Sequence, residues 1–253
     1  AIVVNYLVAF GLGCWLGQSG SFPEAMSLFQ THLLAAVQGG VLAGCFLLMS
    51  AVTRRNGVAV AAVSARIAVV IPVAAAFLLY HEAIGPGRIA GIVLALGALV
   101  LLRPEDSDGG SDPGGWRLPL LLFLGFGFNL AYTKWVQAHF LPPDTYHPYL
   151  TLCFLWAFAW GMTALIIQTG FPRPNLRETL AGLLLGLNNY GAIYFLIAAL
   201  AQPGWASSAV FPMVSVSVVL FSYLGSVLFF GEDVTARKNG AVALGALALV
   251  LVY

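Results

Sequence analysis

The chain has 253 residues, of which 60% are apolar and 8% are charged, and its formal net charge is +1. Soluble domains carry about 25% charged residues, so this composition excludes a globular protein with a water-facing surface. A net charge so close to zero excludes nucleic-acid binding through bulk charge. The three cysteines, Cys14, Cys45 and Cys153, form neither a disulfide framework nor a zinc motif. We expect a polytopic protein of the lipid bilayer, with no metal or cofactor and no nucleic-acid partner.

Nine apolar runs follow one another along the chain, each bounded by charged residues, prolines or glycines. A helix needs about 20 mostly apolar residues to cross a bilayer. We therefore predict an all-α integral membrane protein with about nine transmembrane helices. In chain order they cover residues 1–17, 31–53, 57–80, 88–102, 117–138, 147–168, 179–201, 205–230 and 239–253.

A polar, low-complexity segment interrupts this series once, between Arg103 and Arg117. It is too short to fold as a domain and is typical of a linker. We expect residues 1–103 to form one half of the protein, residues 104–116 the linker, and residues 117–253 the other half.

The basic residues indicate the orientation in the membrane. Eight of the eleven fall in alternate loops on one side, which the positive-inside rule assigns to the cytoplasm. We therefore predict a protein of the bacterial inner membrane. The cytoplasmic basic residues are Arg54, Arg55, those of the Arg103–Arg117 and Arg173–Arg177 segments, and the Arg237–Lys238 pair.

The two halves share an internal repeat. The string ALGAL occurs at residues 95–99 and again at 243–247, and in each half an apolar run ending in a glutamate precedes it, at Glu82 and at Glu232. The second half holds five predicted helices and the first only four, so we expect a further helix before Ala1. Two repeats of five helices have inverted topologies, an arrangement typical of transporters.

At residues 72–82, PVAAAFLLYHE followed by Gly91, and at residues 221–232 followed by Gly240, the chain resembles the EamA-type transporters of the drug/metabolite transporter superfamily. Each segment is similar to the family's apolar helix, terminal glutamate and glycine-rich last helix. The resemblance implies ten helices in two inverted five-helix repeats, a central cavity, and transport of small metabolites.

Arg66 is the most informative polar residue, because it lies about 13 Å into the predicted span 57–80. A cation at that depth costs several kcal/mol unless it is paired or faces water. All ten acidic residues fall in loops or at span ends. Arg66 is therefore predicted to bind an anionic group of a substrate, such as a carboxylate. The alternative is that it bonds backbone carbonyls or extends toward the interface.

Other polar and aromatic residues lie inside the predicted spans. They could line a substrate site, or they could only hold the helices together through hydrogen bonds and packing. Pro72 could act as a hinge or as a static kink in its span. The candidate substrate-binding residues are Asn188, Asn189, Tyr190, Tyr194, Asn5, Tyr6, Gln38, Asn129, Tyr132, Trp156 and Trp160, in addition to Arg66.

The function predicted from these observations is secondary transport of a small polar or amphipathic metabolite, with alternating access between two inverted repeats. One alternative is an intramembrane enzyme, either lipid-modifying or similar to rhomboid-type serine proteases. Its motif would be the GQSG string around Ser19, with His81 or His147 as base. That serine falls in a polar turn rather than at the buried start of a helix, so we expect no enzyme. Another alternative is a channel or scaffold.

Overall fold

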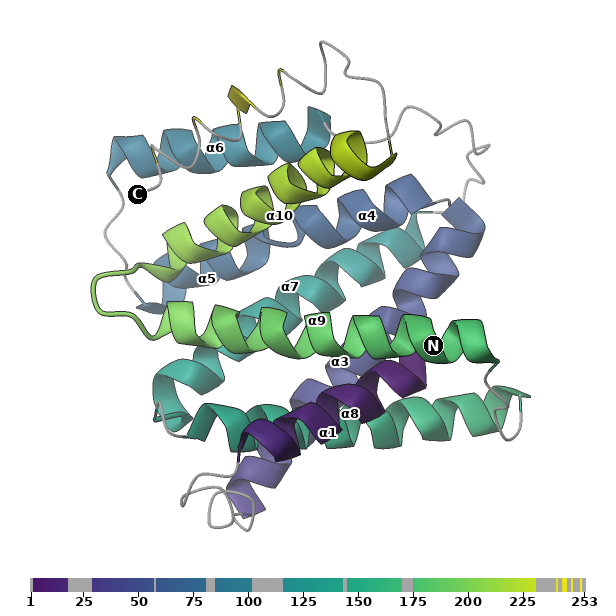
Figure 1. Ribbon diagram of the computed structural model, residues 1–253. Coiled ribbons are helices and arrows are strands. Elements are labelled where there is room, and N and C mark those ends of the chain that lie inside the picture. The colour runs from purple at the N-terminus through teal and green to yellow at the C-terminus, as the bar shows by residue number, and fades with distance from the viewer. Residues whose placement is uncertain are drawn as a thin grey trace. The chain divides into compact units, whose positions relative to one another are not determined.

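The computed structural model describes residues 2–17, 29–56, 58–80, 85–101, 116–142, 145–169 and 175–230, and residues 240, 243, 244, 247 and 251 near the C-terminus (Figure 1). Its elements are all α-helices, which confirms the predicted all-α class for the described residues. They are α1 (Ile2–Leu16), α3 (Phe29–Asn56), α4 (Val58–Ile67), α5 (Val70–Tyr80), α6 (Pro86–Leu101), α7 (Arg117–Phe140), α8 (Tyr146–Thr169), α9 (Leu176–Leu200) and α10 (Ser207–Phe230).

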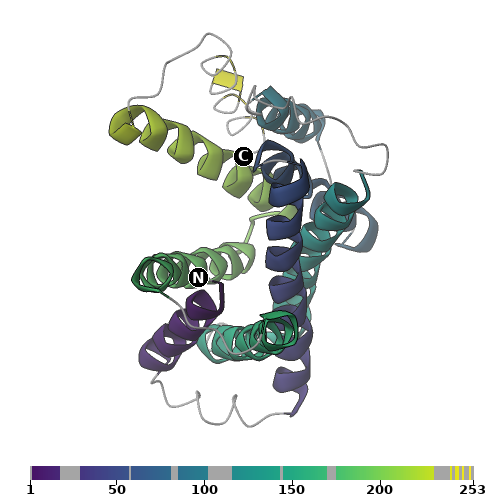
Figure 2. The ribbon, with the colours of Figure 1, turned by 90° about the vertical axis from the view of Figure 1, so that its right-hand side faces the viewer.

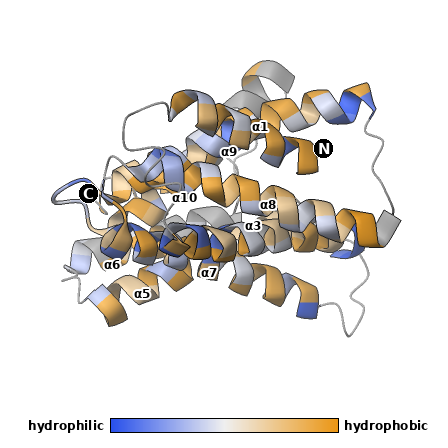
Figure 3. Cartoon of the chain, turned by 90° about the horizontal axis from the view of Figure 1, so that it is seen from below, coloured by the Kyte–Doolittle hydropathy of each residue, from blue (hydrophilic) through white to orange (hydrophobic). Residues whose placement is uncertain are grey.

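Four segments in the described residues are long and apolar enough to cross a membrane, which is compatible with a membrane-embedded protein. They are Phe29–Asn56, Val60–Tyr80, Tyr146–Ile167 and Leu176–Leu200. Apolar residues predominate along the helices in Figure 3. Nine spans remain a prediction, and so does the repeat architecture. Ser19, His81, Glu82, Glu232 and most of the expected last span lie outside the described residues.

The predicted span over residues 57–80 consists of two helices with a short turn between them, within the segment Val60–Tyr80 that is long and apolar enough to cross a membrane. Helix α4 ends at Ile67, Ala68 and Val69 form a turn, and α5 begins at Val70. Pro72 accounts for the interruption, because its ring removes the N–H that would bond the Ala68 carbonyl and collides with that same carbonyl. The Ile71 N–H bonds Ala68 O instead, at 3.1 Å, and the Val69 N–H bonds Arg66 O at 3.3 Å. The predicted kink therefore takes the form of a tightened turn just before Pro72.

The described chain divides into two compact units, and each draws on both halves of the sequence. Unit 1 comprises residues 1–47 and 132–203, and unit 2 comprises residues 48–131 and 204–253. Helices α3 and α7 contribute one end to each unit.

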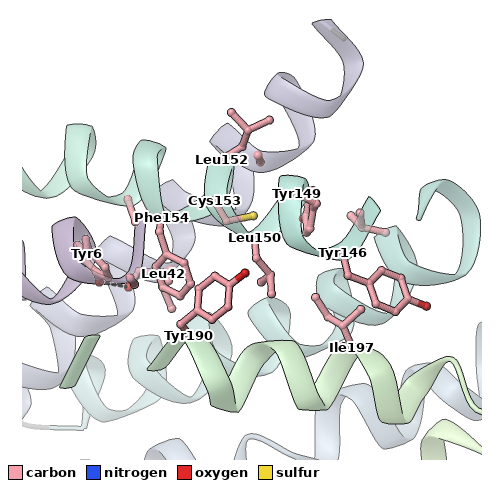
Figure 4. Packing of buried hydrophobic residues seen from close by; sticks show 14 of the residues in the cluster. Tyr6, Leu42, Tyr146, Tyr149, Leu150, Leu152, Cys153, Phe154, Tyr190 and Ile197 are labelled. Atoms are coloured by element: carbon pink, nitrogen blue, oxygen red, sulfur yellow. Dashed lines mark hydrogen bonds between the residues drawn. The ribbon is translucent and has the colours of Figure 1, made fainter. Parts of the chain in front are cut away.

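In unit 1, α1 packs closely on both α8 and α9, and Figure 2 shows the purple α1 beside the green α9. Two glycines permit this approach. A Cβ atom on Gly186 of α9 would lie 2.6 Å from the Asn5 backbone oxygen, and one on Gly13 of α1 would collide with Thr151 Oγ1 of α8. The helices enclose an apolar core whose members include Leu150, Phe154 and Ile197 (Figure 4).

In unit 2, α10 packs on α5 and α6, and α4 also packs on α6. A smaller core joins Val52, Ala61 and Leu122 from α3, α4 and α7. The segment at the α4–α5 interruption packs on α7. Its Ile71 side chain lies so close to Gly127 of α7 that a Cβ atom on Gly127 would collide with it.

Large apolar side chains are exposed on most helices of both units, among them Leu7, Leu33, Leu78 and Leu184. In water such exposure over nearly every helix is costly, whereas in a bilayer these side chains meet lipid tails.

Candidate functional site

A cluster of one imidazole and two phenols joins α8 to α9 in unit 1. His147 Nδ1 lies 2.7 Å from Tyr190 Oη, a hydrogen-bond distance. The His147 ring also stacks on Tyr194, with 4.4 Å between ring centroids and 22° between planes. Tyr190 is almost fully buried, whereas His147 and Tyr194 are half-buried. The three rings therefore form a cluster of polar and aromatic groups within the packing of unit 1.

The local sequence brings these rings together. Tyr190 and Tyr194 are four residues apart, so they lie on the same face of α9. Only residues 170–175 separate α8 from α9, and such a short connection favours antiparallel helices. The start of α8, which holds His147, therefore lies beside the second half of α9. Thr151, one turn along α8, donates its hydroxyl to the His147 carbonyl at 2.7 Å.

A pair of asparagines connects α1 to α9. Asn189 Nδ2 donates to Asn5 Oδ1 at 3.4 Å, and Asn5 is buried. Asn188 is exposed. Of the two adjacent asparagines, Asn189 thus takes the interhelical role that the sequence left open, and Asn188 lies away from the core.

Tyr6 connects α1 to α3. Its hydroxyl donates to the Leu42 carbonyl at 3.3 Å, and no part of its side chain is exposed. Its ring meets Phe46 edge-on, with centroids 6.0 Å apart, and Phe154 in a tilted arrangement. Tyr6 is therefore a core residue whose polar end is bonded to another helix.

Two further candidates join α3 to the end of α7 that belongs to unit 1. Gln38 Nε2 donates to Thr133 Oγ1 at 3.0 Å, and both residues are buried. The Tyr132 hydroxyl donates to the Leu34 carbonyl at 3.2 Å. These hydrogen bonds hold neighbouring helices together.

Trp156 and Trp160, which lie four residues apart on α8, have different surroundings. Trp156 packs against the unit 1 core, with the edge of its ring toward His32 at 6.5 Å between centroids. Trp160 is 50% exposed and lies against Gly40. Trp160 thus faces outward, whereas Trp156 contributes to the core.

Lys134, which the sequence places near the end of a span, is half-buried in α7. Its Nζ donates to the Leu200 carbonyl at 3.3 Å and to Gln137 Oε1 at 3.2 Å. Leu200 is the last residue of α9, where unsatisfied carbonyls carry partial negative charge. Lys134 therefore stabilises the C-terminal end of α9.

Arg66 lies in unit 2, in the last turn of α4 directly before the interruption, and it is half-buried. Within the described residues, no hydrogen-bond or ion-pair partner contacts its guanidinium group. Glu178 is the one acidic residue among all the described residues, and it is exposed and belongs to unit 1. The partial negative charge at the end of a helix favours a cation at this position. Pro72 is buried on the other side of the interruption, and Asn129 is buried in α7.

Among the described residues, no three of the histidine, cysteine, aspartate and glutamate side chains gather into a group that could hold a metal ion.

In unit 1, most of the candidate residues therefore form hydrogen bonds or ring contacts between helices. One further residue joins them, although the sequence indicated it only as a possible catalytic base. His147 belongs with Tyr190 and Tyr194. The short connection between α8 and α9 was the signal that could have identified it, since it aligns residue 147 with the end of α9. Nothing in the sequence marks Thr133 or Thr151 in this way. Threonine is common in apolar helices, where its hydroxyl often bonds the backbone of the same helix.

Comparison with solved structures finds the fold of this chain in another protein. No family model matches the chain. The chain is 22% identical to an uncharacterised protein of Haemophilus influenzae over 259 aligned residues, which cover 100% of this chain and 87% of that protein. It also superposes on a protein of known crystal structure with a TM-score of 0.78 and 16% identity, over 100% of this chain and 88% of that one. At this identity the likeness shows a shared fold alone.

Proposed function

We propose that the protein is a secondary transporter of a small polar or amphipathic metabolite that carries a carboxylate or another anionic group. In this proposal it belongs among the EamA-type transporters, spans the bacterial inner membrane with its basic loops in the cytoplasm, and works by alternating access between inverted repeats at residues 1–103 and 117–253. It is not an enzyme in this proposal.

The observation that carries the proposal is the position of Arg66 at the interruption between α4 and α5. A cation within an apolar segment is costly unless it is paired or faces water, and such residues mark substrate or ion pathways. Transporters commonly bind substrates where a membrane helix is discontinuous, because the ends of the half-helices carry partial charges. Val60–Tyr80, the segment that holds the interruption, is one of the four that could cross a membrane.

The charge of Arg66 argues for a substrate that carries an anionic group. The guanidinium of Arg66 is suited to two parallel hydrogen bonds with a carboxylate. A hydrogen bond to a charged group is stronger than one between neutral groups, so Arg66 decides the proposed substrate class.

The test is a ligand screen followed by transport. The purified protein is heated with each of the twenty amino acids, lactate, pyruvate, succinate and citrate, and with glucose and uridine as uncharged controls. At least one carboxylate should raise the melting temperature, and the same compound should exchange across proteoliposomes in a counterflow assay. Stabilisation by the uncharged controls alone would contradict the anionic substrate. Absence of counterflow for every compound would contradict transport of these metabolites.

A further inference from the structure

His147 differs from the other histidines in the described residues by what its ring contacts. His139 is exposed, and its Nδ1 meets the Trp135 carbonyl of its own helix at 2.8 Å. His32 meets Trp156 through a ring edge. His147, in contrast, meets the hydroxyl of Tyr190 on a different helix, at 2.7 Å, and a second tyrosine stacks on its ring.

Protonation of His147 changes the direction of that hydrogen bond. In the neutral ring, Nδ1 can accept a hydrogen bond from the Tyr190 hydroxyl. In the imidazolium ion both ring nitrogens carry hydrogen, so Nδ1 can only donate, and Tyr190 Oη must accept. The Tyr190 hydrogen then has to find another acceptor. Because Tyr190 is almost fully buried, water cannot readily provide one, and the side chains around it must adjust.

The nearest side chains lie where three helices meet. A Cβ atom on Gly13 of α1 would contact both Thr151 Oγ1 of α8 and the Tyr190 ring of α9, so these groups are neighbours. Thr151 in turn is bonded to the His147 carbonyl. A change at the His147–Tyr190 bond therefore reaches the packing of α1 against α8 and α9.

The groups around His147 allow its ring both to gain and to lose a proton. Tyr194 stacks on the ring and can stabilise an imidazolium through its aromatic face. In unit 1 the described carboxylate is Glu178, about 18 Å along α9 from Tyr190. No fixed anion in the described residues therefore holds the proton on His147. The other titratable side chains described on the helices of unit 1 are Tyr6 and Cys14 on α1, His32 and Cys45 on α3, Tyr132, Lys134 and His139 on α7, Tyr146, Tyr149 and Cys153 on α8, and Arg177 on α9.

We propose that His147 is the binding site of a coupling proton, so that transport is driven by a proton gradient. This inference rests on the proposed transport function and adds its energy source. A proton from water on one side forms an N–H bond on the imidazole and returns to water on the other side. The step that separates the two sides is the reversal of the His147–Tyr190 hydrogen bond at the junction of α1, α8 and α9.

The first test needs no substrate. The histidines of the protein in lipid nanodiscs are labelled with nitrogen-15, and their ring signals are followed by NMR from about pH 5 to about pH 8, where histidine ordinarily changes its charge. The His147 signal is assigned by its absence from the His147→Asn variant. We expect this signal to move between its neutral and charged positions within that range. A ring that stays in one state throughout would overturn the proposal.

The second test separates coupling from transport. Proteoliposomes with a pH gradient of one unit are supplied with the radiolabelled amino acids and organic acids named above. For one proton per substrate, wild-type protein should accumulate the transported compound up to about tenfold. The His147→Asn variant, in which an amide stands near the position of Nδ1, should keep counterflow without a gradient and lose gradient-driven accumulation. His139→Asn serves as the matched control and should behave as wild type.

The outcomes distinguish the two proposals. Equal gradient-driven accumulation by wild type and His147→Asn would overturn proton coupling at His147 and leave transport intact. Counterflow by wild type with no accumulation in response to the pH gradient would also overturn proton coupling and leave transport intact. This result comes from wild-type protein alone, so it does not depend on the folding of a variant. Absence of counterflow in wild type would instead contradict the transport function itself, and proton coupling with it.

Discussion

In unit 1, buried polar side chains are bonded from one helix to another, whereas in unit 2 a helix is interrupted and a cation lies at the interruption. Asn5, Tyr6, Gln38 and His147 each meet a partner on a neighbouring helix. Arg66 in unit 2 lies in the last turn of α4, before the turn at Ala68 and Val69, and in the described residues its guanidinium contacts no such partner. Polar residues in the apolar helices that the structure describes therefore occur in two different settings.

Polarity within an apolar helix does not by itself identify a binding residue. A bond between two side chains in a membrane is worth about 0.6 kcal/mol on average, so several are needed to hold helices in register. Unit 1 provides several, together with glycines that bring the helices close. The charge of Arg66 costs more than such a bond provides, which makes it a stronger indicator of function than any of the amides.

The largest expected effect on stability comes from Gly39 in unit 1. A Cβ atom there would lie 2.6 Å from the Cys153 carbonyl and 2.7 Å from the Ala157 nitrogen, both backbone atoms that cannot move aside. Gly39→Ala should therefore destabilise the protein by about 1–3 kcal/mol. The matched control on the same helix is Gly44→Ala, since nothing lies within 4 Å of a Cβ atom at that position. Thermal unfolding in detergent measures both, and equal melting temperatures would show that α3 and α8 are not packed this closely.

An effect of intermediate size, on amide hydrogen exchange, is expected from substitution of Pro72 in unit 2. Pro72→Ala supplies the missing N–H for the Ala68 carbonyl and removes the ring that collides with it. A net hydrogen bond is worth about 1 kcal/mol, so amide hydrogen exchange at Val69 and Val70 should slow about fivefold. Unchanged exchange would mean that another feature interrupts the helix.

Pro212 provides the control for this experiment. It also lies inside a helix, yet α10 continues from Ser207 to Phe230 without interruption. Pro212→Ala should therefore leave the exchange at Val69 and Val70 as it is in wild type. A similar slowing in both variants would indicate a general stabilisation rather than repair of the α4–α5 turn.

The smallest expected effect on the free energy of unfolding comes from loss of the hydrogen bond between Asn5 and Asn189. A double-mutant cycle with Asn5→Ala and Asn189→Ala should give a coupling energy of about 0.6 kcal/mol, the average for side-chain hydrogen bonds in membranes. Asn188→Ala should leave the free energy of unfolding within about 0.5 kcal/mol of wild type, because that side chain is exposed. Coupling between Asn5 and Asn188 rather than Asn189 would contradict the described register of α1 against α9.

The apolar runs predicted most helices to within a few residues, since length and hydropathy are local properties of the sequence. The predicted run 179–201 corresponds to α9, whose start is fixed by Asn175, which accepts a hydrogen bond from the Glu178 amide. The interruption at Ala68 was harder to predict. A proline acts on the carbonyl four residues before it, and whether the helix bends or breaks there depends on its neighbours, such as Gly127.

The candidate site was predictable in kind but not in detail. Adjacent asparagines point in directions about 100° apart on a helix, so only one can face a given neighbour. The sequence did not specify that Asn189 would face Asn5, because that depends on how α1 and α9 cross. The role of His147 likewise depends on a contact 43 residues apart in the chain, made by the pairing of α8 with α9.

The most direct test of the central claim is counterflow by Arg66 variants in proteoliposomes, with the carboxylate identified in the screen among the amino acids and organic acids named above. Arg66→Gln removes the charge and keeps a hydrogen-bonding side chain, and Arg66→Lys keeps the charge. Because a hydrogen bond to a charged group is worth about 1.5–3 kcal/mol, Arg66→Gln should lower the rate at least about tenfold, with Arg66→Lys less affected. Unchanged melting temperatures would exclude unfolding as the cause. Wild-type counterflow in folded Arg66→Gln would contradict the claim that Arg66 binds the substrate.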